Sequence, residues 1–213
     1  MSKADQLFVT MCEDILDHGF STEGQKVRPH WEDGTPAYTI KNFGVVNRYD
    51  LSEEFPALTL RRTAVKTAVE EMLWIWQRKS NNIRDLAEMG LEPCAYSVTF
   101  NVTGDRLNAI LNQRSQDILA ANNWNVVQYA VLVYMMAQVT GFRPGELVHV
   151  IADAHIYDRH VDIIRELIRR PQYPAPKFRL NPEVKDFYDF TPDDVILEDY
   201  QHGPQVKNIP VAV

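Results

Sequence analysis

Residues 125–140, NVVQYAVLVYMMAQVT, are the feature that most restricts the fold of this chain. They predict a helix that is apolar almost all round and ends at Gly141, a pattern typical of a helix inside a core. A second helix is predicted over 63–79, where Trp74 and Ile75 widen the apolar stripe. Two such helices indicate a buried helical layer that other elements must cover.

Strand patterns surround these two helices. After Pro93 apolar residues alternate over 96–102 and again over 107–111, with a turn at 103–105, so a hairpin is predicted. The other predicted elements are a helix at 3–18, a loop at 20–36, a strand at 37–50 interrupted by a turn at 42–44, a short strand at 147–152, a helix at 160–170, a helix start at 191–192 and a strand at 195–197. Because strands and helices do not alternate regularly, the fold class is predicted to be α+β, with one domain spanning 1–213.

Composition narrows the possible partners and location. The net charge of −7 and the pI near 5.4 argue against a broad nucleic-acid footprint, although a few arginines can still bind a phosphorylated small molecule. No apolar run reaches the roughly 20 residues of a membrane span, and the first residues, MSKADQLF, lack a signal-peptide core. A cytoplasmic protein is therefore expected.

The densest polar cluster is Asn112-Gln113-Arg114-Ser115-Gln116-Asp117, at the end of the predicted hairpin. Such residues are unusual in a strand unless they line a cleft. The planar fork of Arg114 matches a phosphate group, and Ser115 can add a hydroxyl donor. The alternative is an ordinary solvated strand end.

The chain has two cysteines, too few for a disulfide framework or a structural zinc site. Cys12 lies in the apolar stripe of the first helix and is predicted to be a buried, inert thiol. Cys94 follows Pro93 at a strand start, where a side chain can face a cleft. Because the thiolate is the nucleophile, Cys94 needs a nearby cation, which Arg114 would supply. A buried structural cysteine is the alternative.

Two further groups of side chains could carry chemistry. Glu71 borders the apolar stripe of its helix, where a partly desolvated carboxylate suits proton transfer; a snorkelling or salt-bridged surface glutamate is the alternative. Asp153, His155, Tyr157 and His160 cluster after a strand, but their spacing does not match a known metal-ligand pattern. No metal site is predicted.

Several segments resemble the thymidylate synthase family in order and spacing. These segments are Glu92-Pro93-Cys94, Gln113-Arg114-Ser115-Gln116-Asp117, Trp124-Asn125-Val126-Val127-Gln128-Tyr129, Ala137-Gln138-Val139-Thr140-Gly141, Pro144-Gly145-Glu146, Asp153-Ala154-His155-Ile156-Tyr157 and a Pro-Val-Ala-Val end. The N-terminal half matches at Arg28, Phe55-Pro56-Ala57-Leu58-Thr59 and Glu71-Met72-Leu73-Trp74. The resemblance covers nearly the whole chain and is greatest to versions from low-GC Gram-positive bacteria and their phages.

This resemblance implies a large twisted mixed β-sheet backed by helices, and a homodimer formed sheet to sheet. It also implies reductive methylation of dUMP to dTMP, with 5,10-methylenetetrahydrofolate as co-substrate and no metal. The implied catalytic residues are Cys94, Glu71 and Arg114. The implied dUMP-binding residues are Arg28, Gln113, Arg114, Ser115, Gln116, Asp117, Asn125, His155 and Tyr157. Those implied for the folate are Asp117, Ala212 and Val213.

The implied roles are specific. Cys94 would attack C6 of the uracil, while Arg114 would bind the phosphate and help to keep Cys94 as thiolate. Glu71 would manage protons around the pyrimidine through ordered water. Asn125 would read the uracil edge, which argues against the sister dCMP hydroxymethylases, because an Asp at this position would favour cytosine.

The chain departs from the family at two places. Ala95 stands where a His often follows the nucleophile. More importantly, Leu86 runs directly into Ala87 where family members have several dozen further residues, including a tandem arginine pair that reaches the partner subunit's phosphate. Either that block is disordered and so absent from the sequence, or the gene product is shortened. The family-like sequence on both sides favours the first explanation.

Two other functions stay open at this point. One is a dUMP or dCMP hydroxymethylase of similar architecture. The other is a truncated nucleotide-binding protein without catalysis.

Overall fold

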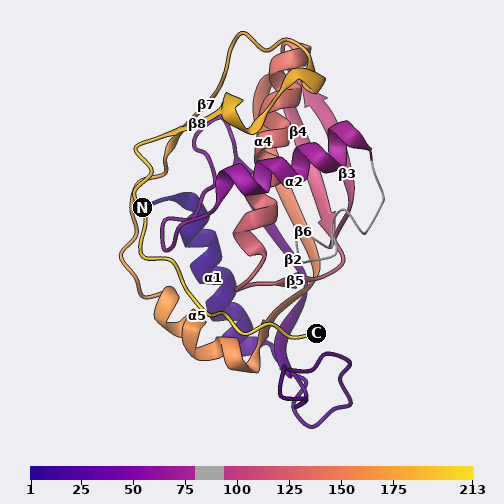
Figure 1. The fold of residues 1–213 in the computed structure, drawn as a ribbon, viewed down its shortest axis with the longest axis vertical. Helices are drawn as coiled ribbons and strands as arrows, with labels where there is room; N and C mark the ends of the chain where they lie inside the picture. Colours follow the sequence, from indigo (N-terminus) through magenta and orange to yellow (C-terminus); the bar gives the residue numbers. More distant parts are fainter. Residues whose placement is uncertain (80–93) are drawn as a thin grey trace.

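A mixed β-sheet carries the fold of this protein (Figure 1). The computed structural model describes residues 1–79 and 94–213, so the Glu92-Pro93 part of the nucleophile motif and the Leu86–Ala87 junction lie outside the described residues. The strands of the main sheet run in the order β1-β2-β6-β4-β3, with β5 also beside β6. Their bounds are β1 Phe20–Ser21, β2 Thr39–Asp50, β3 Ala95–Thr103, β4 Arg106–Gln113, β5 Gln116–Asp117 and β6 Arg143–Tyr157.

The sheet is mixed because β6 pairs antiparallel with β2 and parallel with β4, while β3 and β4 form an antiparallel hairpin. A separate two-stranded ribbon joins β7, Lys177–Leu180, to β8, Val195–Glu198. The α+β class expected from the sequence is confirmed.

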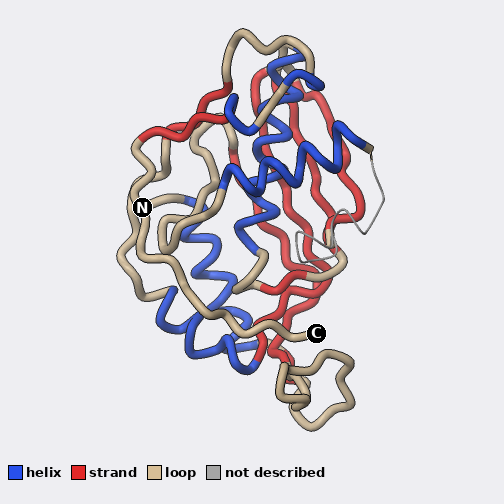
Figure 2. The backbone as a smooth tube through the Cα atoms, in the orientation of Figure 1, coloured by secondary structure: helices blue, strands red, loops and turns tan. Residues whose placement is uncertain are grey.

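The helices shield the sheet from one side, as Figure 2 shows. Their bounds are α1 Lys3–His18, α2 Val65–Arg78, α4 Asn122–Thr140 and α5 Val161–Leu167, with short 3-10 turns at Asp158–His160, Phe187–Asp189 and Pro192–Asp194. α4 packs on β4 and β6, α2 lies across α4, and α1 packs on β2. None of the helices in the described ranges has the length and apolarity that crossing a membrane requires.

α4 is the central helix of the core, as its all-round apolar sequence predicted. Buried side chains occur on every side of it, because the sheet covers one side and α2 another. Gly141 ends the helix in a left-handed conformation, with φ of 77°, and its N–H bonds to the carbonyls of Ala137 and Gln138. A side chain with a Cβ would be strained there, which explains a glycine at this stop.

The local predictions succeeded where a regular period was present. The helix at 3–18, the hairpin with its turn at 103–105 and the strand at 195–197 are all observed, and the helix predicted at 63–79 runs over Val65–Arg78. The helix predicted at 160–170 is shorter, since its first turn is a 3-10 helix and α5 ends at Leu167. The predicted start at 191–192 is also a 3-10 turn, closed by a capping box between Thr191 and Asp194.

Two strand predictions and one loop prediction were wrong in extent. β2 is not interrupted: Gly44 takes a φ of 76°, yet Phe43 and Val45 pair with β6 in one continuous register. β6 is far longer than 147–152, because β2 and β5 supply partners for its polar residues up to Tyr157. The loop at 20–36 begins with β1, which pairs with β2.

Large apolar side chains on the strands are exposed. Phe43 is 93% exposed, Val46 51% and Ile110 42%. Val46 pairs with Val150 and Ile110 with Val148 in neighbouring strands, so these positions form a continuous apolar strip on the sheet. Such a strip on a soluble protein is typical of an interface.

A buried carboxylate ties α1 to the chain before α2, and we expect Asp5→Ala to lower the free energy of unfolding by about 1–3 kcal/mol. Asp5 accepts hydrogen bonds from the backbone N–H of Thr59 at 2.8 Å and from the Ser2 hydroxyl at 2.8 Å. Removing it leaves the Thr59 N–H buried without its acceptor. Urea unfolding measures the change, and Asp17→Ala, at an exposed position of the same helix, should be nearly neutral.

Candidate active site

Cys94 and Arg114 meet where the β3–β4 hairpin opens. The backbone N–H of Arg114 donates to the carbonyl of Cys94 at 3.1 Å, just beyond the strand pair Ala95–Gln113. Cys94 is half-buried and the side chain of Arg114 is exposed. The hairpin therefore places Cys94 and Arg114 on adjacent strand ends; that the Arg114 guanidinium activates the thiol stays a prediction.

A chain of amide hydrogen bonds leads inward from this strand end to α2. Gln113 Nε2 donates to Asn125 Oδ1 at 3.1 Å, Asn125 Nδ2 donates to Gln128 Oε1 at 3.0 Å, and Gln128 Nε2 donates to Glu71 Oε2 at 3.0 Å. The indole Nε1 of Trp124 donates to the same Glu71 oxygen at 2.6 Å. Glu71 is thus hydrogen-bonded within the core and is not a snorkelling surface residue.

A second group of polar side chains lies where β5 and β6 end. β5 pairs with β6 through Asp117 and His155, and Nδ1 of His155 lies 3.2 Å from Asp153 Oδ1. The rings of His155 and Tyr157 meet edge to face, 5.0 Å between centroids. This second group supplies two of the residues predicted to hold the sugar of the nucleotide.

Strand pairing along β6 links the two groups. Burial raises the pKa of Tyr157, and the charges of Asp117 and Asp153 raise it further. Along β6, β4 ends at Gln113 opposite Ile151 and β5 begins at Gln116 opposite Ala154, so the ends of β3, β4 and β5 adjoin one shared region beside β6.

The buried His160 and the partly exposed Asp117 form a pair behind this region, with Nδ1 and Oδ1 3.5 Å apart. Burial alone would raise the pKa of Asp117, but the hydrogen bond and charge of His160 outweigh it and hold that pKa below its ordinary value. For His160, burial lowers the pKa, while Asp117 and the carbonyl of Pro210 raise it above its ordinary value. The pair therefore favours the ionised forms of both groups.

The pair predicts a pH window for stability. The pair contributes its full stability between the ordinary Asp pKa of 3.8 and the ordinary His pKa of 6.5, where both groups are ionised in the folded protein. This stability is lost as pH rises through the raised pKa of His160. It is also lost as pH falls through the lowered pKa of Asp117. We expect the stability difference between the wild type and His160→Gln to be largest near pH 5–6, about one to two units above the ordinary Asp value, and to shrink as the pH rises through the raised pKa of His160. Chemical denaturation at each pH measures it.

The C-terminal segment returns to this region (Figure 1). Nε2 of His160 lies 2.8 Å from the carbonyl of Pro210, and Val213 exchanges two backbone hydrogen bonds with His30, at 2.8 and 2.9 Å. Arg28, exposed, stands two residues before His30. The tail that contains Ala212 is therefore tied down beside the loop that carries Arg28.

Not every predicted side chain faces the shared region. The amide of Gln116 is buried and bonds to the start of α4, where it contacts Asn122 at 3.3 Å. Ser115 is half-buried between β4 and β5. In the described ranges no group of three or more His, Cys, Asp or Glu side chains is placed to hold a metal ion.

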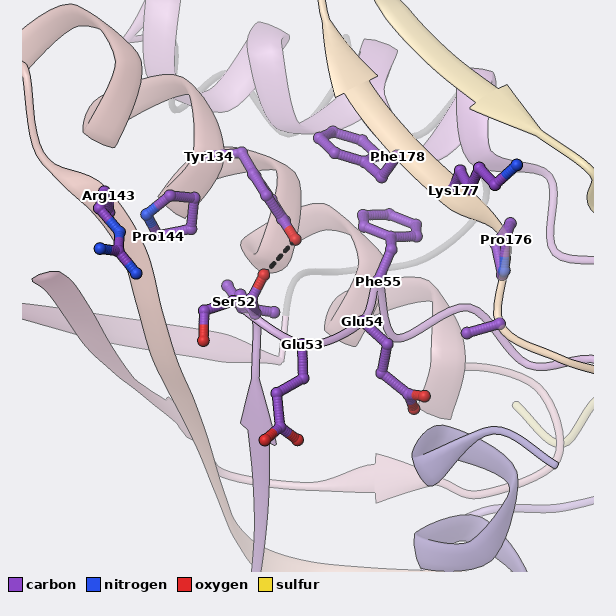
Figure 3. A pocket seen from close by; sticks show the side chains of 12 residues that line it. Ser52, Glu53, Glu54, Phe55, Tyr134, Arg143, Pro144, Pro176, Lys177 and Phe178 are labelled. Atoms are coloured by element: carbon purple, nitrogen blue, oxygen red, sulfur yellow. Dashed lines mark hydrogen bonds between the residues drawn. The ribbon is translucent and has the colours of Figure 1, made fainter.

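A distinct cavity of about 500 Å³ lies at the opposite end of β6 (Figure 3). Stacked rings of Phe55 and Phe178, 4.3 Å apart, line it together with Tyr134, and Glu53 and Lys177 lie at its border. None of the predicted site residues lines this cavity.

The chain as a whole is similar to known proteins. The family model described as thymidylate synthase matches residues 6–90 and 79–213. This chain belongs to the thymidylate synthase family. Thymidylate synthase 1 of Bacillus subtilis (strain 168) is 34% identical to it, the thymidylate synthase of Bacillus phage phi3T 33% and that of Clostridium beijerinckii 31%, each alignment covering 97% of this chain and 98% of the relative. The predicted likeness to Gram-positive and phage members is thereby confirmed.

A solved structure shows the same fold. The thermostable thymidylate synthase A from Bacillus subtilis superposes with a TM-score of 0.92 at 32% identity, over 100% of both chains. The alignments to the Bacillus relative and to phage phi3T extend over 274 residues, more than the 213 of this chain. The two matched ranges of the family model overlap at 79–90, which includes Leu86 and Ala87. These findings support the predicted missing block; whether it is disordered or deleted stays a prediction.

Sequence reasoning did not identify four residues that contact members of the candidate site. Trp124 and Gln128 were noted only within a motif, and neither His149 nor Trp31 was considered. Gln128 carried a signal, since it is a polar residue of an apolar helix placed one turn after Asn125. Trp31 carried none: its contacts with Tyr157 and His160, at 5.5 and 5.7 Å between centroids, join distant segments.

Proposed function

We propose that this protein catalyses the reductive methylation of dUMP to dTMP with 5,10-methylenetetrahydrofolate. Membership of the thymidylate synthase family supports this reaction. The single observation that carries the assignment is the junction of Cys94 with Arg114, next to an amide chain that leads through Asn125 to Glu71. A nucleophile, a cation, a base-reading amide and a carboxylate for proton transfer are the groups this reaction needs.

Cys94 begins the reaction as thiolate. Its sulfur bonds to C6 of the uracil, and the electron pair of the C5–C6 double bond moves toward C5 and O4, so that C5 becomes nucleophilic. The folate supplies the one-carbon unit and then the hydride, leaving as dihydrofolate. The C5 proton is lost before the hydride moves, so that the one-carbon unit separates from the folate as an exocyclic methylene on C5. Addition of the hydride to this methylene expels the Cys94 thiolate from C6 and gives dTMP. Glu71, which already holds the Trp124 indole and the Gln128 amide, moves protons at the pyrimidine carbonyl through water.

Arg114, Ser115 and Arg28 bind the phosphate in this proposal. The two guanidinium groups are exposed, and Ser115 adds a hydroxyl donor beside Arg114. His155 and Tyr157 hold the deoxyribose hydroxyl, and Gln113, Gln116 and Asp117 complete the nucleotide site. A basic surface is unnecessary for such a ligand.

The described residues also fit the folate. Asp117 offers an acceptor whose side chain is 20% exposed, and its lowered pKa keeps it ionised. Ala212 and Val213 lie in the C-terminal segment that His160 and His30 hold beside the site. Closure of this segment over bound ligands would exclude water from the reacting atoms.

A homodimer is part of the proposal. The apolar strip formed by the exposed Val46 and Ile110 and their strand neighbours Val150 and Val148 supports a contact between two sheets, because exposed apolar side chains gathered on one face are typical of an interface. Sedimentation at micromolar concentration tests it. A protein that stays monomeric there would contradict this part of the proposal.

The deciding experiment incubates the purified chain with dUMP and the folate and identifies the product by mass spectrometry. We expect dTMP and dihydrofolate in equal amounts, with tritium released from C5-labelled dUMP. A hydroxymethyl product would instead assign a hydroxymethylase. Tight dUMP binding without tritium release would assign a non-catalytic binding protein. The intact mass, compared with 24.6 kDa, shows in the same preparation whether the missing block is present.

A further inference from the structure

His149 is a fully buried polar residue that the proposed mechanism does not use. It lies on β6 and pairs in register with Leu111 of β4 and Asn47 of β2. Its Nε2 contacts Oε1 of Gln113, the first member of the amide chain that runs to Glu71. His149 therefore extends the amide chain beyond Gln113, at the end away from Glu71.

The direction of every hydrogen bond in the chain is set at the opposite end. The amide of Gln128 faces the carbonyl of Ala68 at 3.1 Å and the carboxylate of Glu71 at 3.0 Å, and both of these only accept. Gln128 must present its NH₂ group to them, so its oxygen faces Asn125. The same reasoning turns the Asn125 oxygen toward Gln113.

It follows that Gln113 presents its own oxygen to His149. An amide oxygen only accepts, so Nε2 of His149 carries the proton and donates it. Two independent observations agree. Nδ1 of His149 has no hydrogen-bond partner among the described residues, which suits an unprotonated nitrogen better than an N–H. Burial also lowers the pKa of His149 to about 3, which keeps the ring neutral with a single proton.

We propose that His149, as its Nε2–H tautomer, is a positioning residue that holds Asn125 in the amide orientation that reads uracil and rejects cytosine. This inference rests on the proposed function. Uracil presents an N3–H donor and an O4 acceptor, whereas cytosine presents an N3 acceptor and an amino donor. After its bonds to Gln113 and Gln128, Asn125 retains one acceptor site and one N–H, which match uracil.

Reading cytosine would require the Asn125 amide to turn over. That turn breaks its bonds to Gln113 and Gln128 together, and it can be accommodated only if Gln113 also turns and offers its NH₂ group to His149. The Nε2–H of His149 opposes this second turn, because two donors would then face each other. The discrimination of uracil from cytosine thus depends on both ends of the amide chain, Glu71 with Gln128 at one end and His149 at the other.

Replacing His149 tests this directly, with the ratio of dCMP to dUMP dissociation constants as the readout. His149→Phe keeps a ring but removes the donor, and we expect the ratio to fall about ten-fold, the effect of one lost buried hydrogen bond. His149→Gln can place an amide N–H where Nε2 stood and should keep the ratio within about three-fold. Asn47→Leu disturbs the same buried layer without touching the amide chain and should leave the ratio unchanged.

A His149→Phe variant that folds and keeps the wild-type ratio would overturn the proposal, and so would His149→Gln falling as far as His149→Phe. If neither variant folds, the wild type still decides. NMR of the ¹⁵N-histidine-labelled chain at about pH 5, above the lowered pKa of His149, should show a protonated Nε2 and an unprotonated Nδ1 for His149. The opposite tautomer refutes the proposed positioning role. A wild type that binds neither nucleotide refutes the proposed function instead.

Discussion

Cys94→Ser is expected to abolish the covalent adduct that the wild type forms with 5-fluoro-dUMP and the folate, and to reduce turnover at least about 10³-fold. A serine hydroxyl at this position stays protonated near neutral pH, and Arg114 beside it cannot change that, so the attack on C6 has no nucleophile. The adduct is measured as a mass increase of the denatured protein. Binding of dUMP should persist, because the phosphate and base contacts remain.

Cys12→Ala is the matched control. Cys12 is fully buried on α1, and burial raises the pKa of its thiol far above the ordinary value, so it is unreactive. This variant should form the adduct in full, with at most a modest loss of stability. If Cys94→Ser still formed the adduct and Cys12→Ala did not, the nucleophile would be Cys12 and the assignment of Cys94 would be wrong.

Glu71→Gln is expected to lower kcat by about 10²–10⁴-fold, the usual contribution of a general acid–base group. The amide oxygen of the new side chain can still accept from Trp124 and Gln128, so the amide chain keeps its direction. The capacity to take and return a proton is lost. Steady-state kinetics should therefore show a fall in kcat with little change in the dUMP dissociation constant.

Glu70→Gln provides the comparison, because Glu70 is the exposed neighbour of Glu71 on the same helix. It should behave as wild type. If Glu71→Gln weakened dUMP binding and left kcat intact, Glu71 would be a binding residue and its assigned role in proton transfer would be wrong.

The elements that were predicted well share one property. α1 and the β3–β4 hairpin each follow one regular apolar period, and α4 is apolar on every side over sixteen residues, so local sequence defines them. β6 was predicted at less than half its length, because Asp153 and His155 break the apolar pattern that identifies a strand. Those residues stay in the strand only because β2 and β5 offer hydrogen-bond partners on both sides. Their partners come from segments more than 30 residues away along the chain.

The candidate site also has features that the sequence indicates and features that only the tertiary structure shows. The chemistry of single residues was readable from the sequence: a thiol at a strand start, an arginine at a hairpin end, a carboxylate on a buried helix. Their mutual geometry was not, since Glu71, Gln113 and Asn125 come from three different elements. The roles of Gln128 and His149 depend wholly on that geometry.

The nucleophile illustrates the division. The sequence by itself determined that Cys94 stands in a family motif and that Arg114 ends a neighbouring strand, because motif order and strand period are local properties. Only the tertiary structure decided that these strand ends meet, with Arg114 bonded to the Cys94 carbonyl. It also decided that the amide chain can point only one way, because hydrogen-bond direction depends on which acceptors the folded core places at its end.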